Sequence, residues 1–114
     1  MAKDKKQKLV PVTIKWRDDK QGGHNQVILE NIDNKHVSVG LTTKASKGKG
    51  STNYKLENDP LGKGKTSYMR RQGTVAPQTE YKDPRKGNMT PKDHARATEY
   101  GERAKQKYIN KKKK

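Results

Sequence analysis

The stretch that decides the fold is residues 26–44, QVILENIDNKHVSVGLTTK. Residues 27–29, Val-Ile-Leu, form an apolar run typical of a buried strand. In residues 36–43, apolar side chains alternate with polar or small ones, which is the period of a strand with one buried face. Between the two runs, Asp33 and Asn34 suit the positive φ angles of a hairpin turn. The stretch therefore predicts a β-hairpin, and we expect the rest of the chain to be organised around it.

A first strand is expected before the hairpin, over residues 9–16, because apolar residues occupy every second position there. Pro11 has no N–H to donate to a neighbouring strand, which favours an edge strand or the start of a strand. Trp16 lies on the apolar face and is assigned to the core.

Residues 17–23, RDDKQGG, are typical of a turn. Residues 1–8 carry four lysines and are expected to be a disordered basic arm.

After the hairpin, residues 44–65 form a long polar segment rich in glycine and lysine. Long segments of this kind are usually functional or disordered. A short strand is predicted within residues 53–56, and further strand structure within residues 63–71 and 74–76. Residues 77–89 contain two prolines and a glycine, so a loop is predicted there.

The C-terminal part has the pattern of a helix. In residues 90–93, TPKD, the threonine suits the N-cap, the proline suits the first helical position, and Asp93 can reach back as in a capping box. We expect a helix over about residues 91–109, within a helical region 90–110, and a solvated basic tail over residues 111–114. One helix face contains mostly small residues and can approach a sheet closely: Ala97, Gly101, Ala104 and Tyr108.

Composition limits the fold to one small domain. The chain has 114 residues, of which 26% are hydrophobic, and it contains no phenylalanine, so the core must be small. Several short strands followed by one helix indicate a mainly β protein with flexible basic termini. The predicted architecture is a small, partly open β-barrel over residues 9–76 with a helix packed on it.

The charge of the chain indicates an anionic partner. Lysine and arginine number 28 against 12 aspartate and glutamate residues, a formal net charge of +16. Such an excess opposes compaction unless an anion neutralises it. Nucleic acid is the first hypothesis, because neutralising its phosphates releases counterions. No membrane partner is expected, since no segment combines basic residues with a bulky apolar face.

The sequence argues against several other functional classes of protein. The chain has no cysteine, and its three histidines lack ligand spacing, so we expect no metal and no cofactor. No apolar run reaches the length of a membrane span, and the first residues lack the apolar core of a signal peptide, so a cytoplasmic protein is expected. Residues 62–67, GKGKTS, lack the first glycine of a Walker motif at its required spacing, which argues against nucleotide hydrolysis.

The pattern of residues 22–44, GGHNQVILENIDNKHVSVGLTTK, is similar to that of a known protein family. A basic residue before an apolar strand, a turn, and a second strand ending in Leu-Thr-Thr-Lys resemble the SH3-like barrels of the MazF/PemK-type toxin superfamily, including its ToxN-like branch. The resemblance covers about residues 9–76, with His24-Asn25 where the family usually has Arg or Lys followed by Pro.

The resemblance implies an SH3-like barrel that cleaves single-stranded RNA without metal and that an antitoxin or another inhibitor binds. His24 would take the basic position, Thr42 and Thr43 the hydroxyl position, and Lys44 would be the neighbouring cation. This chemistry needs a base for the 2′-OH and donors for the developing phosphate charge. The same residues also fit a simpler interpretation, in which His24 is a loop histidine and the threonines are ordinary strand residues.

Aromatic residues beside cations suit single-stranded nucleic acid, because bases stack on rings while cations follow the backbone. The alternative is that the tyrosines pack the barrel and the arginines are solvated. The predicted nucleic-acid-binding residues are Lys47, Lys49, Tyr54, Lys55, Lys63, Lys65, Tyr68, Arg70 and Arg71.

Three functions remain open on the sequence: a metal-independent endoribonuclease, a non-catalytic barrel that binds RNA or DNA, and a structural protein whose basic tails dock into a ribonucleoprotein or mobile-element assembly.

Overall fold

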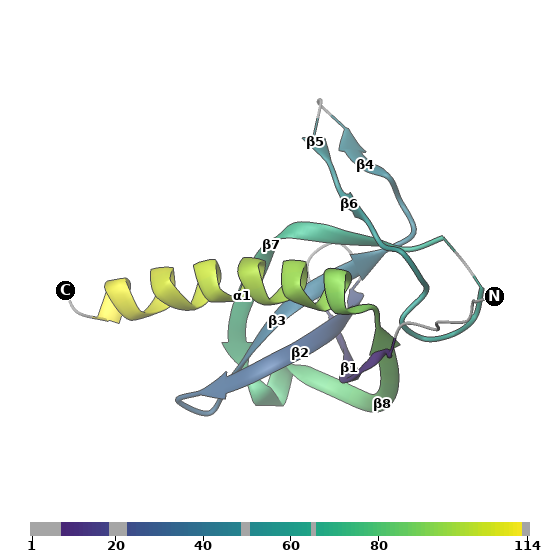
Figure 1. The fold of residues 1–114 in the computed structure, drawn as a ribbon. Helices are drawn as coiled ribbons and strands as arrows, with labels where there is room; N and C mark the ends of the chain where they lie inside the picture. The colour runs from purple at the N-terminus through teal and green to yellow at the C-terminus, as the bar shows by residue number, and fades with distance from the viewer. Residues whose placement is uncertain (1–7, 19–22, 49–50, 65, 113–114) are drawn as a thin grey trace.

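The computed structural model describes residues 8–18, 23–48, 51–64 and 66–112. Six strands form one antiparallel sheet in the order β6-β7-β3-β2-β1-β8, and a single helix follows (Figure 1). The sheet is not closed, so the predicted fold class, mainly β with a partly open barrel and one C-terminal helix, is confirmed. The sheet strands are β1 (Val10–Arg17), β2 (His24–Ile32), β3 (Lys35–Thr42), β6 (Tyr54–Lys55), β7 (Tyr68–Pro77) and β8 (Tyr81–Met89). The other elements are β4 (Ser46–Gly48) and β5 (Ser51–Thr52), which pair with each other, the 3-10 helix η1 (Gln78–Glu80) and α1 (Pro91–Lys112).

The predicted hairpin is present as β2 and β3. The two strands pair antiparallel from Gln26 opposite Gly40 to the turn. Asp33 and Asn34 form the turn with φ angles of 52° and 62°, the left-handed region that Asp and Asn tolerate better than most residues. The alternating valines of β3 are fully buried on the core side, as the pattern predicts.

The edge-strand interpretation of Pro11 is wrong, because β1 lies between β2 and β8 inside the sheet. The other interpretation, a proline at the start of a strand, is confirmed: Pro11 is the second residue of β1, opposite Asn88. A missing N–H is tolerated there because the strand is only beginning.

The loop predicted over residues 77–89 is wrong, because β8 occupies most of that range and belongs to the barrel. The pairing of β8 with β1 shifts register between Ile14 and Trp16, so that Asp83 and Pro84 form a bulge outside the ladder. Asp83 has φ 54° in this bulge. A proline is compatible with a strand at a bulge and on a sheet edge, and β8 has both features.

Residues 56–61 bridge the gap between the two edge strands. The segment leaves edge strand β6, and its Pro60 carbonyl accepts a hydrogen bond from the Asn88 N–H of edge strand β8 at 2.9 Å. Glu57 N–H donates to the Asp93 carboxylate of α1 at 2.7 Å. The open side of the barrel is therefore covered by an irregular segment that is hydrogen-bonded to β8 and to the helix.

The helix begins as predicted and extends further than predicted. Thr90 Oγ1 accepts a hydrogen bond from Asp93 N–H at 3.1 Å, which satisfies one of the unpaired donors of the first turn. Asp93 does not complete a capping box, because its carboxylate accepts from Glu57 instead; burial raises the pKa of this carboxyl. The helix continues to Lys112, so Lys111 and Lys112 belong to it rather than to a tail.

The small-residue face of α1 packs on the sheet, as the sequence predicts. Ala97, Tyr100 and Gly101 are buried there. A Cβ added at Gly73 of β7 would lie 2.8 Å from the Tyr100 carbonyl oxygen, so the strand and the helix touch through their backbones. Within the described ranges, no helix has the length and apolarity needed to cross a membrane. The buried core contains Val12, Ile14, Val27, Val39, Leu41, Leu56, Met69, Met89, Ala97 and Tyr100.

Candidate nucleic-acid interface

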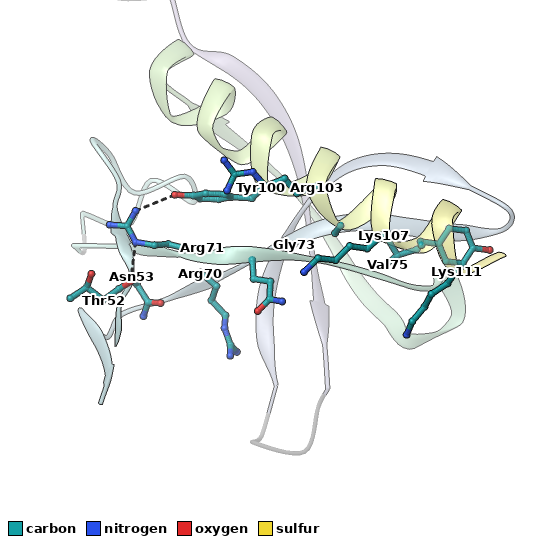
Figure 2. A pocket seen from close by; sticks show the side chains of 13 residues that line it. Thr52, Asn53, Arg70, Arg71, Gly73, Val75, Tyr100, Arg103, Lys107 and Lys111 are labelled. Atoms are coloured by element: carbon teal, nitrogen blue, oxygen red, sulfur yellow. Dashed lines mark hydrogen bonds between the residues drawn. The ribbon is translucent and has the colours of Figure 1, made fainter. Parts of the chain in front are cut away.

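A groove of about 750 Å³ lies between β7 and α1 (Figure 2). The strand and the helix meet closely along it, because a Cβ at Gly73 would lie 3.2 Å from the Cβ of Ala104. Thr52, the last residue of β5, and Asn53, which follows it, line the groove, and so does Lys111 in the last turn of α1. We call this site the basic groove.

Five cationic side chains line the basic groove: Arg70 and Arg71 from β7, and Arg103, Lys107 and Lys111 from α1. Three of them, Arg70, Lys107 and Lys111, form no ion pair with any residue that the structure describes. Their positive charge is therefore not neutralised within the described chain, and a bound anion can neutralise it.

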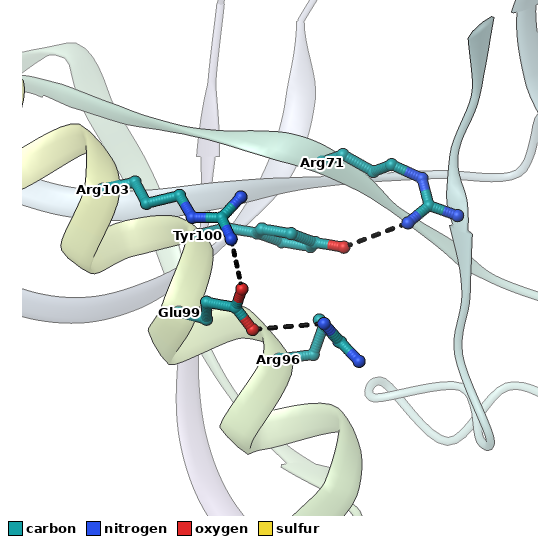
Figure 3. Close-up of polar contacts among 5 residues, drawn as sticks. All are labelled: Arg71, Arg96, Glu99, Tyr100 and Arg103. Atoms are coloured by element: carbon teal, nitrogen blue, oxygen red, sulfur yellow. Dashed lines mark hydrogen bonds and ion pairs between the residues drawn. The ribbon is translucent and has the colours of Figure 1, made fainter.

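The two remaining arginines are held by the protein. Arg71 Nε donates to the Thr52 carbonyl oxygen at 3.0 Å, and its Nη1 lies 3.4 Å from the Tyr100 hydroxyl. Arg103 pairs with Glu99 at 2.5 Å, and the other oxygen of Glu99 accepts from Arg96 at 3.1 Å (Figure 3). These contacts fix the guanidinium groups at the end of the groove nearest the start of α1.

The tyrosines near the groove are occupied by other side chains. The rings of Tyr54 and Tyr100 meet edge to face at 6.5 Å, and Tyr100 is only 4% exposed. The guanidinium carbons of Arg71 and Arg96 lie over the Tyr54 ring, 5.9 and 5.5 Å from its centre. These two rings therefore pack against arginines and the core. Tyr108 also lines the groove, and the Nζ atoms of Lys35 and Lys112 lie 6.0 and 5.6 Å from the centre of its ring.

Acidic residues of the β2–β3 hairpin anchor the C-terminal half of α1. Asp33 accepts hydrogen bonds from Lys112 Nζ at 2.5 Å and from Tyr108 Oη at 3.0 Å, which lower the pKa of this carboxyl. Glu30 pairs with Lys105 at 3.1 Å, and this hydrogen bond raises the pKa of the lysine. Lys107 and Lys111 take no part in these contacts and line the groove, which Tyr108 lines as well.

The predicted binding residues fall into separate places. Arg70 and Arg71 line the basic groove, and Tyr54 packs beside it. Lys55 is exposed on β6 opposite the half-buried Tyr68. Lys63 lines a different cavity. The side chain of Lys47 and the whole of Lys49 and Lys65 lie outside the described residues.

Three groove residues, Arg103, Lys107 and Lys111, were missing from the predicted set. The sequence-based prediction places Lys111 in the basic tail and gives no binding role to Arg103 or Lys107. Their spacing of four residues is the signal that could have identified them, because such residues lie along one side of a helix.

The residues predicted to be catalytic line one cavity of about 320 Å³, which we call the His24 cavity. His24 begins β2, and Thr42 ends β3, so antiparallel pairing brings them to the same end of the hairpin. Thr43 and Lys44 follow directly and line the cavity as well. The structure thus brings together the four residues, which the resemblance placed in one site.

Local contacts shape the His24 cavity. Thr42 Oγ1 accepts a hydrogen bond from Lys44 N–H at 3.1 Å, which fixes the turn after β3. Trp16 is half-buried in the cavity lining rather than in the core, and its Nε1 donates to Asp18 at 2.7 Å. Gly23, with φ 99°, packs so tightly on the indole that an added Cβ would lie 2.8 Å from it. Asp59 also lines the cavity and accepts hydrogen bonds from the N–H groups of Leu61 and Lys63.

No protein-family model, curated protein or solved structure matches the chain. In the described part of the chain, no three His, Asp or Glu side chains gather closely enough to hold a metal ion. The two sites are therefore interpreted from their geometry and charge.

Proposed function

We propose that the protein binds RNA through the basic groove. The observation that carries this proposal is the presence of three cations, Arg70, Lys107 and Lys111, that line one groove without an ion pair among the described residues. Phosphates satisfy such a site, and release of their counterions supplies affinity. The resemblance of residues 22–44 to RNA-cleaving barrels favours RNA over DNA, and the experiment below includes DNA as an alternative ligand.

The kind of contact follows from the side chains. Cations that meet phosphates position a nucleic acid without reading its bases. The rings of Tyr54 and Tyr100 are covered by arginines and by the core, and two lysines lie over the ring of Tyr108, so base stacking adds little. We therefore expect binding that depends strongly on salt and weakly on base sequence.

Fluorescence anisotropy with labelled RNA between about 50 and 200 mM salt tests the proposal. Arg70→Ala and Lys107→Ala should each weaken binding several-fold and reduce the slope of log K against log salt by about 0.7, the value for one phosphate of a single strand. Lys86→Ala is the matched control, because this exposed lysine lies on edge strand β8 and does not line the groove. Equal losses of RNA affinity in all three variants would reject the groove as the binding site. Tighter binding of DNA than of RNA of the same sequence would identify DNA as the ligand instead.

The His24 cavity supports a second candidate function, because it gathers His24, Thr42, Thr43 and Lys44 in one lining. We propose metal-independent cleavage of the bound RNA there. His24 takes the proton of a ribose 2′-OH, whose oxygen attacks the adjacent phosphorus as the bond to the 5′-oxygen breaks. Lys44 and the threonine hydroxyls donate to the charge that develops on the phosphate oxygens. The products are a 2′,3′-cyclic phosphate and a 5′-OH end, which takes up a proton.

Incubation of labelled RNA with the protein in EDTA separates the two functions. Cleavage that leaves 2′,3′-cyclic phosphate ends, is lost in His24→Ala and Thr43→Ala, and spares a 2′-deoxy substrate would support the second function. Intact RNA that is nevertheless bound in the basic groove would reject it and leave RNA binding as the function.

A further inference from the structure

Three cations of the basic groove are spaced evenly along α1. Arg103, Lys107 and Lys111 are four residues apart, and all three line the groove (Figure 2). Four residues of α-helix rise about 6 Å, so the three positions follow one another along the groove at roughly that step. This step is comparable to the phosphate repeat of an extended single strand, whose backbone cationic grooves follow.

We propose that these three residues form a charge ladder that binds consecutive phosphates of one extended single strand. The inference rests on the proposed RNA binding and adds the form of the ligand. The ladder is a single row of cations about 12 Å long, with β7 as the opposite wall of the groove. One row matches the single phosphate backbone of one strand, whereas a duplex carries two backbones.

Glu99 ends the ladder at its N-terminal side. It lies four residues before Arg103, in the position that a fourth cation of the ladder would take. Its carboxylate instead pairs with Arg103 and Arg96, at 2.5 and 3.1 Å (Figure 3). A phosphate at this step would meet a like charge, so the bound strand extends from Arg103 toward the C-terminal end of the helix.

The experiment compares a single-stranded oligoribonucleotide with a duplex of the same sequence and adds variants at the end of the ladder. The single strand should bind at least tenfold more tightly than the duplex. Glu99→Lys should tighten single-strand binding several-fold and increase its salt slope by about 0.7, as expected for one more phosphate. Glu99→Gln, which removes the repelling charge and releases Arg103 from its ion pair without adding a cation, should tighten binding less than Glu99→Lys and increase the slope less.

Glu102→Lys is the matched control, because it makes the same change of charge on the same helix but outside the row of residues 99, 103, 107 and 111. Glu102 does not line the groove and accepts a hydrogen bond from Gln106 at 3.1 Å. Circular dichroism confirms that each variant keeps its helix.

Equal affinity for duplex and single strand would reject the proposed ladder. Equal gains in single-strand affinity from Glu99→Lys and Glu102→Lys would reject it as well. The proposed function would still stand if Arg70→Ala and Lys107→Ala weakened binding. Unchanged binding in those two variants would instead reject the basic groove itself.

Discussion

At the scale of single residues, His36 is enclosed by an aromatic ring and two polar partners. Its ring is 5% exposed and meets the ring of Tyr81 edge to face at 4.8 Å. Lys15 Nζ donates to Nε2 at 3.0 Å, so Nδ1 carries the proton that faces Asn31 Oδ1 at 2.5 Å. This arrangement fits the neutral ring. Burial, and then the charge of Lys15, lower the pKa of His36 below its ordinary value near 6.5.

The lowered pKa of His36 predicts a pH dependence of stability. Between the folded pKa and about 6.5, the unfolded chain binds more protons than the folded chain, so the free energy of unfolding increases with pH across this window. The contribution of neutral His36 to the free energy of unfolding is complete above about pH 6.5. It is lost as the pH falls through the pKa of His36 in the folded protein. Urea unfolding at about pH 5 and pH 7.5 should show this increase in the natural chain and a smaller one in His36→Gln.

His94→Gln is the control for that experiment, because His94 lies in α1 outside the Lys15–His36–Asn31 network. If this variant loses the pH dependence and His36→Gln keeps it, the dependence has been assigned to the wrong histidine.

At the level of the elements, the contact between β7 and α1 decides whether the basic groove keeps its shape. Gly73→Ala would place a Cβ 2.8 Å from the Tyr100 carbonyl oxygen and 3.1 Å from the Gly101 Cα. Both atoms are backbone, so the helix has to move, and we expect a loss of about 1–3 kcal/mol in the free energy of unfolding, as for other overpacked sites. Chemical denaturation measures this loss.

Gly101→Ala is the matched comparison. Its added Cβ would meet chiefly the end of the Leu29 side chain, which can rotate, and alanine favours the helix by about 1 kcal/mol. It should therefore be less destabilising than Gly73→Ala. The opposite order would show that Leu29 is held more rigidly than the helix backbone.

The elements that the sequence predicts well have local signals. The hairpin follows from alternation and two turn residues, and the helix start follows from Thr90 and Pro91. Strand β8 was missed because Asp83 and Pro84 normally mark a loop, and only pairing with the distant β1 makes a bulge at them. The inner position of β1 could not be predicted either, because its second partner is β8, a strand far away in the sequence.

The candidate sites show the same limit. Antiparallel pairing within one hairpin brings His24 and Thr42 together, so a local pattern was enough to group the residues of the His24 cavity. The basic groove combines Arg70 with Lys107, from elements that are far apart in the sequence. Nothing local shows that these two elements pack together, because the contact depends on Gly73 and Gly101 as much as on the cations.

Over the whole molecule, the excess of positive charge should weaken the fold at low salt. The formal charge of +16 is spread over 114 residues, so repulsion between cations outweighs the exposed ion pairs, which stabilise little individually. We expect the midpoint of urea unfolding to rise as salt increases from about 0.01 to 0.15 M, because the screening length falls from about 30 to 8 Å. A midpoint that falls with salt would show that the ion pairs dominate.

The pairing of β1 with β8 also affects how the protein is made. Val10 lies opposite Met89, so the first strand receives its second neighbour only after residue 89 has been synthesised. At about 5–20 residues per second, the ribosome needs roughly 4–16 s to pass from one partner to the other. During that time the hairpin of β2 and β3 can form, but the side of β1 that faces β8 stays unpaired. The first 89 residues carry 19 of the 28 lysines and arginines, and during this interval the nascent chain lies beside ribosomal RNA, which is itself a polyanion of the kind that the basic groove is proposed to bind.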